Sequence, residues 1–305
     1  VLDEIETARI SKKIKEDNAL WLGIPKIPSI LQDNTDRNRT SPFAFTGNKF
    51  EFRAVGSSAN SSAPMTILNT IVADQLIAFK TDVNKLIKKG DKKDIAILTV
   101  LKRYIKESKD IRFEGNGYSE SWEKEAKSRG LSNVKTTPQA LDADVSEKTM
   151  ALFERTRVFS KREAHARYEI RLESFYKKMQ IESRVMEELI KSTIIPAAIT
   201  YQNSLIKNVR GLKELGLDKS LYETQLAIIK ALSMHINAIK KNEDAMIAER
   251  EKADKLDDVR AHSIAYDEKV KAYFEPIRFH VDRLEQLVDD ELWPLPKFRE
   301  LLFIK

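Results

Sequence analysis

The sequence predicts a mainly α-helical chain in which a long antiparallel helical bundle follows a short α+β segment. Three observations support this fold class. The 305 residues include only 9 glycines and 9 prolines, so few positions break a helix. Charged residues make up 33% of the chain, above the roughly 25% of an average globular protein. After residue 60, apolar residues recur at spacings of three and four, as on the buried face of an amphipathic helix.

The first 60 residues differ in pattern from the rest of the chain. Residues 1–22 are charged, with scattered Leu and Ile, which favours a helix. Residues 23–47 contain three prolines and many polar residues and cannot form a regular helix. Their apolar residues favour an ordered irregular segment over a disordered one; these are Ile27, Ile30, Leu31, Phe43 and Phe45.

Residues 48–55 alternate with period two and are the clearest predicted strand. Phe50 and Phe52 belong to one face, whereas three charged residues belong to the other. The charged residues are Lys49, Glu51 and Arg53. A single strand is not stable alone. Its partner strands are therefore expected in sequence outside this chain or in another chain.

Residues 61–305 are expected to form one helical C-terminal domain. Its long helices are predicted over residues 61–89, 91–107, 159–211, 219–255 and 261–290. Ser61 or Ser62 is the expected N-cap of the first helix, and Gly211 is the expected C-cap of the third. The last three helices each carry an apolar stripe, and they can bury these stripes against one another as an antiparallel bundle.

Residues 108–158 interrupt the helical pattern. Only short helices are expected there, near Trp122 and near residue 145. Within the later long helices, Pro196 and Pro276 are expected to produce kinks, because proline lacks the backbone donor that the helix needs.

The composition excludes several kinds of site and partner. The net charge is only +6, and basic and acidic residues alternate along the chain, so no nucleic-acid partner is expected. The absence of cysteine excludes disulfides, thiolate metal sites and a cysteine nucleophile. No run of about 18 apolar residues occurs, and no signal peptide is expected before Val1. No membrane association and a cytoplasmic location are therefore expected.

The charged face of the predicted strand has two interpretations. It can be an ordinary exposed sheet face. Alternatively, it can line a cleft in which Glu51 binds Mg²⁺ or Mn²⁺, while Arg53 and Lys49 hold anions. Arg37 and Arg39 in the preceding segment could reach the same anion. A metal flanked by fixed cations suits phosphoryl transfer.

Other candidate motifs are weaker. The four histidines, at positions 165, 235, 262 and 280, all lie in predicted helices, and none has a histidine four residues away, so packing or surface roles are expected. The sequence contains neither a Walker A loop nor G-x-G-x-x-G. The Gly115-Asn116-Gly117 segment is too short for a phosphate loop and is expected to form a tight turn.

Two runs of residues resemble the glutamine synthetase family. The first, from Asn34 to Phe43, contains Asn-Arg-Thr at residues 38–40. The second, from Gly47 to Arg53, is similar to the basic-x-Glu-x-Arg strand at the end of that family's catalytic domain. Three further runs resemble the type III branch: Ala-Val-Gly-Ser-Ser-Ala-Asn at 54–60, Arg-Phe-Glu-Gly-Asn-Gly-Tyr-Ser at 112–119 and Asp-Asp-Glu-Leu-Trp-Pro-Leu-Pro at 289–296.

The resemblance implies ATP-dependent joining of ammonia to glutamate through γ-glutamyl phosphate. Glu51 matches the family's ligand for the metal, Mg²⁺ or Mn²⁺, near the ATP phosphates. Arg53 matches the arginine that contacts glutamate and the transferring phosphoryl group, and Arg39 matches one that contacts ATP phosphates. Lys49 stands where many relatives have arginine and keeps only the charge. Ala44 replaces another arginine of the common pattern.

The resemblance also implies that this chain is a C-terminal portion that is inactive alone. Residues 1–60 would be the end of the catalytic domain, an α+β remnant of it. Type III enzymes are large homo-oligomers, dodecamers, and their C-terminal helices are expected in subunit contacts. The alternative is a helical subunit-assembly module with no catalysis of its own.

Overall fold

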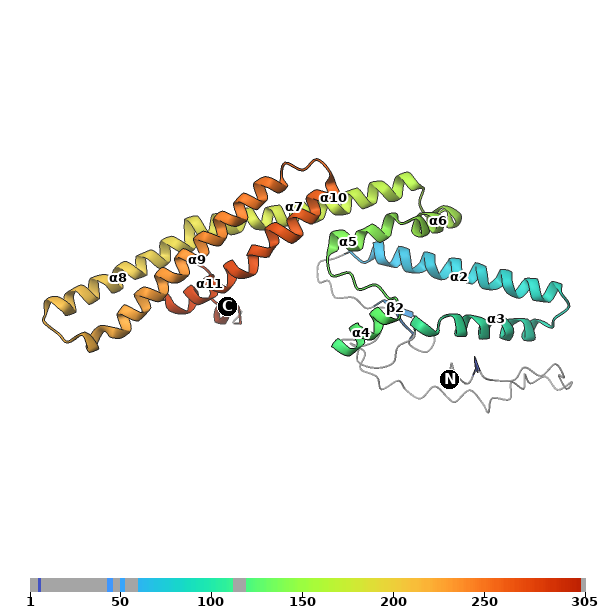
Figure 1. Cartoon of the computed structure of the whole chain (residues 1–305), viewed down its shortest axis with the longest axis horizontal. Coiled ribbons are helices and arrows are strands. Elements are labelled where there is room, and N and C mark those ends of the chain that lie inside the picture. Colours follow the sequence, from blue (N-terminus) through green and yellow to red (C-terminus); the bar gives the residue numbers. More distant parts are fainter. Residues whose placement is uncertain (1–4, 7–42, 46–49, 53–59, 112–118, 303–305) are drawn as a thin grey trace. The chain divides into compact units, whose positions relative to one another are not determined.

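The computed structural model describes residues 5–6, 43–45, 50–52, 60–111 and 119–302. The described part is mainly helical and contains several long helices, as predicted (Figure 1). The chain divides into two compact units. Unit 1 comprises residues 1–134 and 147–161, and unit 2 comprises residues 135–146 and 162–305. The division of the sequence into domains at residue 60 stays a prediction.

Two short strands form an antiparallel hairpin in unit 1. They are β1, Phe43–Phe45, and β2, Phe50–Phe52. The prediction that all partner strands lie outside the chain is therefore wrong, because β1 pairs with β2 within it. The Phe-Ala-Phe alternation of β1 is only three residues long, too short to stand out among the prolines and polar residues around it. The predicted helix over residues 1–22 lies outside the described residues except at residues 5–6, which are helical.

A helical hairpin dominates unit 1. It consists of α2, Ser62–Lys88, and α3, Lys93–Glu107. The turn contains Gly90 with a φ of 100°, a conformation that glycine adopts without strain. Val83 and Val100 are the buried valines of its core. Ser61 is the N-cap residue of α2, as predicted, but its side chain makes no capping hydrogen bond. Instead, the side chain of Asn60 accepts a 2.8 Å hydrogen bond from the Ser62 amide.

The region 108–158 is more helical than the sequence indicates. It contains η2, Lys109–Ile111; α4, Glu120–Ser128; α5, Thr137–Leu141; η3, Asp142–Val145; and α6, Glu147–Thr156. Helix α6 packs on α2, where Arg155 donates to both carboxylate oxygens of Asp74 at 2.6 Å. Buried Met150 and Phe153 mark the inner face of α6, so packing rather than periodicity defines this short helix.

Two long helical segments define unit 2 (Figure 1). The first comprises α7, Lys161–Leu189; the π-helix η4, Ile190–Ile194; and α8, Ile195–Glu214. The second comprises η5, Lys219–Tyr222, and α9, Glu223–Ala253, which returns along α8. The predicted end of the first segment, Gly211, is wrong, because the segment continues to Glu214. Gly216, with a φ of 75°, lies directly after its C-cap residue.

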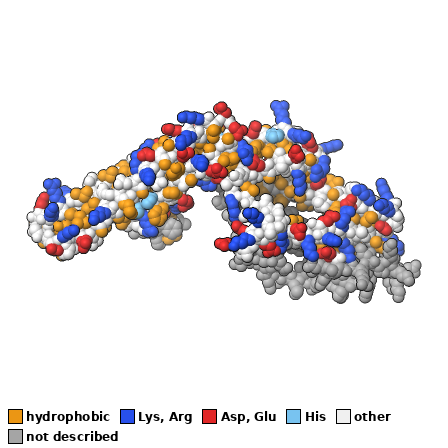
Figure 2. Space-filling view, viewed as in Figure 1, with side chains coloured by type: hydrophobic (Ala, Val, Ile, Leu, Met, Phe, Trp, Pro, Cys, Tyr) orange, Lys and Arg blue, Asp and Glu red, His pale blue; other side chains and the backbone are white. Residues whose placement is uncertain are grey.

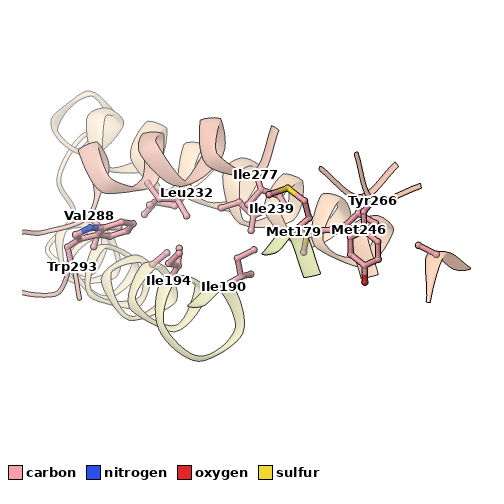
Figure 3. Packing of buried hydrophobic residues seen from close by; sticks show 14 residues of the cluster. Met179, Ile190, Ile194, Leu232, Ile239, Met246, Tyr266, Ile277, Val288 and Trp293 are labelled. Carbon is pink, nitrogen blue, oxygen red and sulfur yellow. The ribbon is translucent and has the colours of Figure 1, made fainter. Parts of the chain in front are cut away.

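After α9 the chain forms α10, Val259–Ala265; the π-helix η6, Tyr266–Val270; η7, Lys271–Tyr273; α11, Phe274–Leu287; and α12, Phe298–Leu301. Of these elements, η6, η7 and α11 pack against α9. Figure 3 shows the resulting core, in which Ile190 and Ile194 of η4 lie near Leu232 and Ile239 of α9. Trp293, after α11, completes the cluster. Among the described helices, none combines the length and the apolar character needed to cross a bilayer.

Candidate functional site

The described hairpin contains one of the four predicted site residues. Glu51 is the central residue of β2 and pairs with Ala44 of β1. Arg39, Lys49 and Arg53 lie outside the described residues, as does the Gly115-Asn116-Gly117 segment. Their predicted roles therefore rest on the sequence.

The hairpin register places like residues opposite one another. Phe43 pairs with Phe52, and Phe45 pairs with Phe50. Because directly paired residues of antiparallel strands share a face, the four phenylalanine positions lie on one face of the hairpin, and Ala44 and Glu51 lie on the other. Ala44, which stands where the family pattern has an arginine, is thus the register partner of Glu51, the predicted metal ligand. A hairpin of two strands alone is marginally stable, so this hairpin needs further packing partners.

No complete metal site occurs among the described residues. No group of three or more His, Asp or Glu side chains in the described ranges is arranged to hold a metal ion. A carboxylate such as that of Glu51 suits Mg²⁺ or Mn²⁺, but one carboxylate fills only part of a coordination shell. A metal at Glu51 therefore needs further ligands from elsewhere.

Sequence reasoning missed a pair of histidines in unit 2. His235 of α9 and His280 of α11 bring their Nδ1 atoms within 2.9 Å of each other. Their ring centroids are 5.2 Å apart. Burial, followed by the proximity of His280 and Arg283, lowers the pKa of His235. The two residues are far apart in the sequence, and only the packing of α11 on α9 joins them, so no motif could have revealed the pair.

A second polar cluster ties the C-terminal end of α9 to α7 and η6. The Tyr266 hydroxyl donates to Asp254 Oδ1 at 2.5 Å, and Gln180 Nε2 donates to the same oxygen at 3.0 Å. His262 stacks on Tyr176 with ring centroids 4.1 Å apart. Burial, together with the bond to Asp254, raises the pKa of Tyr266, so this hydroxyl stays protonated. The cluster closes a helix end.

A line of charges joins η4 to α9. Glu243 is fully buried, and Lys240 Nζ donates to its Oε2 at 3.0 Å. Lys191 lies 3.8 Å from the other oxygen, Oε1, which accepts no hydrogen bond. Lys191 also donates to Glu187 at 2.5 Å, and Arg250 donates to Glu187. The hydrogen bonds of Lys191 and Arg250 lower the pKa of Glu187. These contacts join α7 and η4 to α9.

Comparison with known proteins shows similarity to one family. Residues 96–213 match the glutamine synthetase C-terminal domain. A glutamine synthetase of Bacteroides fragilis (strain YCH46) is 46% identical over 310 residues, which cover 100% of this chain and 42% of the relative. A type-3 glutamine synthetase of Dictyostelium discoideum is 33% identical over 93% of this chain and 39% of the relative.

A third relative agrees with the first two. A glutamine synthetase of Butyrivibrio fibrisolvens is 31% identical over 99% of this chain and 42% of the relative. The chain thus spans about two fifths of the length of the relatives that it matches. The similarity covers the strand with Glu51 as well as both helical units. The chain is similar to the C-terminal part of glutamine synthetases, one of which is a type-3 enzyme.

Proposed function

We propose that this chain supplies the C-terminal part of a type III glutamine synthetase, which uses ATP to join ammonia to glutamate through γ-glutamyl phosphate. The observation that carries the proposal is similarity to a glutamine synthetase over the full length of the chain. Because the chain covers 42% of that relative, the remaining ligands and substrate contacts would come from sequence that this chain does not contain. The chain alone is then inactive.

Four residues would contribute to the site. Glu51 would hold a divalent cation, Mg²⁺ or Mn²⁺, which would neutralise charge on the ATP phosphates. Arg53 would contact glutamate and the transferring phosphoryl group, where a planar guanidinium can make two parallel hydrogen bonds. Arg39 would contact ATP phosphates, and Lys49 would add a positive charge beside them. The proposed site is in the cytoplasm.

A chimera tests these roles. This chain would replace the matching region of the Bacteroides fragilis relative, and γ-glutamyl transfer and ATP turnover would be measured. We expect Glu51→Gln and Arg53→Ala each to lower kcat by about 10²–10³-fold, the range found when a group that stabilises transition-state charge is removed. Glu51→Gln should also raise the metal concentration needed for half-maximal activity.

Matched control substitutions use exposed residues of the same types. Glu251→Gln and Arg162→Ala change side chains on the surfaces of α9 and α7 and should leave kcat within about twofold of the parent chimera, as expected for surface sites remote from the chemistry. If Glu51→Gln and Arg53→Ala behaved like these controls, the catalytic assignment would be wrong.

A second candidate function is subunit assembly by the long helices of unit 2, which we propose form an antiparallel bundle. Apolar side chains lie among the charged ones on the molecular surface (Figure 2). On α7 and α8, Ile170, Ile181 and Ile206 are 59%, 61% and 46% exposed. Exposed apolar residues on one helical segment favour contact with another subunit, here a further copy of the same chain in a large homo-oligomer such as a dodecamer.

The mass of the chimera in solution tests assembly. The triple substitution of Ile170, Ile181 and Ile206 by serine should release smaller species, because it removes apolar surface from the contact. A control triple substitution of the exposed residues Lys178, Lys207 and Lys213 by serine, on the same helices, should leave the mass unchanged. An intact oligomer in the isoleucine variant would show that these three isoleucines are not needed for assembly, whether or not the enzyme remains active.

A further inference from the structure

The contact between His235 and His280 has no part in the proposed catalytic function. The two Nδ1 atoms lie 2.9 Å apart, within hydrogen-bond distance, and they come from α9 and α11, which run side by side (Figure 1). His235 is 8% exposed, so water cannot readily replace this bond. The pair lies one helical turn from Leu232 and Leu284, which are fully buried core residues on the two helices.

The short distance fixes the number of protons at this contact. A neutral imidazole has one nitrogen that donates and one that accepts. One of the two Nδ1 atoms must therefore carry a hydrogen and donate it to the other, whose ring carries its hydrogen on Nε2. When both rings are doubly protonated, both Nδ1 atoms are donors. The hydrogen bond is then lost, and two positive charges face each other.

The surroundings do not compensate for a second charge. Arg283 of α11 adds another positive charge that acts on His235. One turn away on α9 lie Leu232, Ala238 and Ile239, none of them charged. No acidic side chain in the described part of the chain forms an ion pair with either imidazole.

The other packed elements offer no counter-charge either. The stretch of α8 that faces this part of α9, fixed by the hydrogen bond from Gln202 to the Ile229 carbonyl, contains no charged residue between residues 195 and 206. On α11, Asp282 pairs with Arg278 at 3.7 Å. After α11, Lys297 is held by Asp290 and by the Glu285 carbonyl at 2.9 Å.

We propose that His235 and His280 form a proton-sensitive contact, which holds α11 against α9 while the two rings share one proton and loosens α11 when both rings are charged. The direction of the pH effect follows from the lowered pKa of His235. The unfolded chain, with an ordinary histidine pKa of about 6.5, binds the proton more tightly than the folded chain. The contact therefore stabilises unit 2 fully above about pH 6.5, and this stability is lost as the pH falls through the folded-state pKa.

Tryptophan fluorescence can report the loss of stability of unit 2 in the full chain. The sequence has three tryptophans, and Trp293 is the one in unit 2, buried in the cluster that contains Leu232 and Leu284. With Trp21→Phe and Trp122→Phe as background substitutions, Trp293 is the sole emitter. Urea unfolding is then followed at a series of pH values from about 5.5 to 7.5, where histidine is the side chain that ordinarily titrates.

We expect the unfolding constant to rise as the pH falls below 6.5, with a slope of up to about tenfold per pH unit for one proton. His235→Gln with His280→Gln puts an amide donor and an amide acceptor on each side of the contact and removes both titrating groups, so it should remove this slope. The control His165→Gln alters an exposed histidine of α7 and should retain the slope. A flat wild-type profile, or a slope that survives in the double glutamine variant, would overturn the proposal.

A measurement on the wild-type chain covers the case in which the double variant does not fold. Imidazole resonances followed by NMR should show His235 titrating below the ordinary histidine pKa of about 6.5. Titration of His235 at or above that value would also overturn the proposal.

Discussion

At the scale of single residues, Glu243 is the most unusual side chain of unit 2. It is a carboxylate with no exposed surface, and one of its oxygens accepts no hydrogen bond. Taking such a charge out of water costs several kcal/mol, which the half-exposed Lys191 and Lys240 repay only in part. Lys191 and Lys240 do not depend on it, because Lys191 also binds Glu187 at 2.5 Å and Lys240 also binds Asp244 at 2.6 Å.

We therefore predict that Glu243→Leu leaves the free energy of unfolding unchanged or raises it by up to about 2 kcal/mol, because leucine fits a buried site between helices without a desolvation cost. Urea unfolding of the full chain, followed at Trp293, measures the effect. Asp244→Leu, at the neighbouring exposed position, is the control and should change stability by less than about 0.5 kcal/mol. A loss above about 2 kcal/mol for Glu243→Leu would show that the carboxylate itself holds α9 against η4.

At the scale of elements, periodicity predicted the long helices better than the short ones. The helix predicted over residues 61–89 is α2, and the helix predicted over residues 219–255 contains α9. Their apolar stripes extend over many turns, so the pattern is clear in the sequence alone. In α6, by contrast, ten residues carry only two buried apolar side chains. Such a helix depends on its contact with α2, which no local pattern reveals.

Helix ends and irregularities were harder to predict than helix bodies. Gly211 was a plausible C-cap, but its backbone is helical. The positive φ is instead at Gly216, five residues later. The sequence offers both glycines near the end of this helix, and only the backbone conformation shows which of them follows the last turn. The two prolines expected to cause kinks each follow a change of helix type: Pro196 lies in the first turn of α8 after the π-helix η4, and Pro276 lies in the first turn of α11 after η6 and η7.

The alternation of apolar and charged residues predicted only part of the hairpin. It predicted β2, with Glu51 at its centre, and it missed β1. The register adds what the sequence could not show, namely that Ala44 is the partner of Glu51. The chemistry of this face came from the family resemblance, since alternation alone could not separate an exposed sheet face from a cleft wall.

At the scale of the whole molecule, each unit has its own hydrophobic core. Val100 and Val83 belong to the core between α2 and α3 in unit 1. Leu232 and Ile277 belong to the core around α9 in unit 2. The two clusters share no residue. A substitution that leaves a cavity in one cluster removes contacts made only within that unit.

We predict that the chain unfolds in two transitions that respond separately to core substitutions. Leu232→Ala should destabilise the unit 2 transition by about 2–5 kcal/mol. Val100→Ala should destabilise the unit 1 transition by about 2 kcal/mol, because it removes about two methylene equivalents from a buried site. Single-tryptophan chains that retain either Trp122, in unit 1, or Trp293, in unit 2, follow the two transitions in urea.

Met234→Ala, at a residue of α9 that is 57% exposed, is the control and should move neither midpoint. If Val100→Ala moved both midpoints equally, the two units would unfold as one cooperative body, and the separate cores would not define separate transitions.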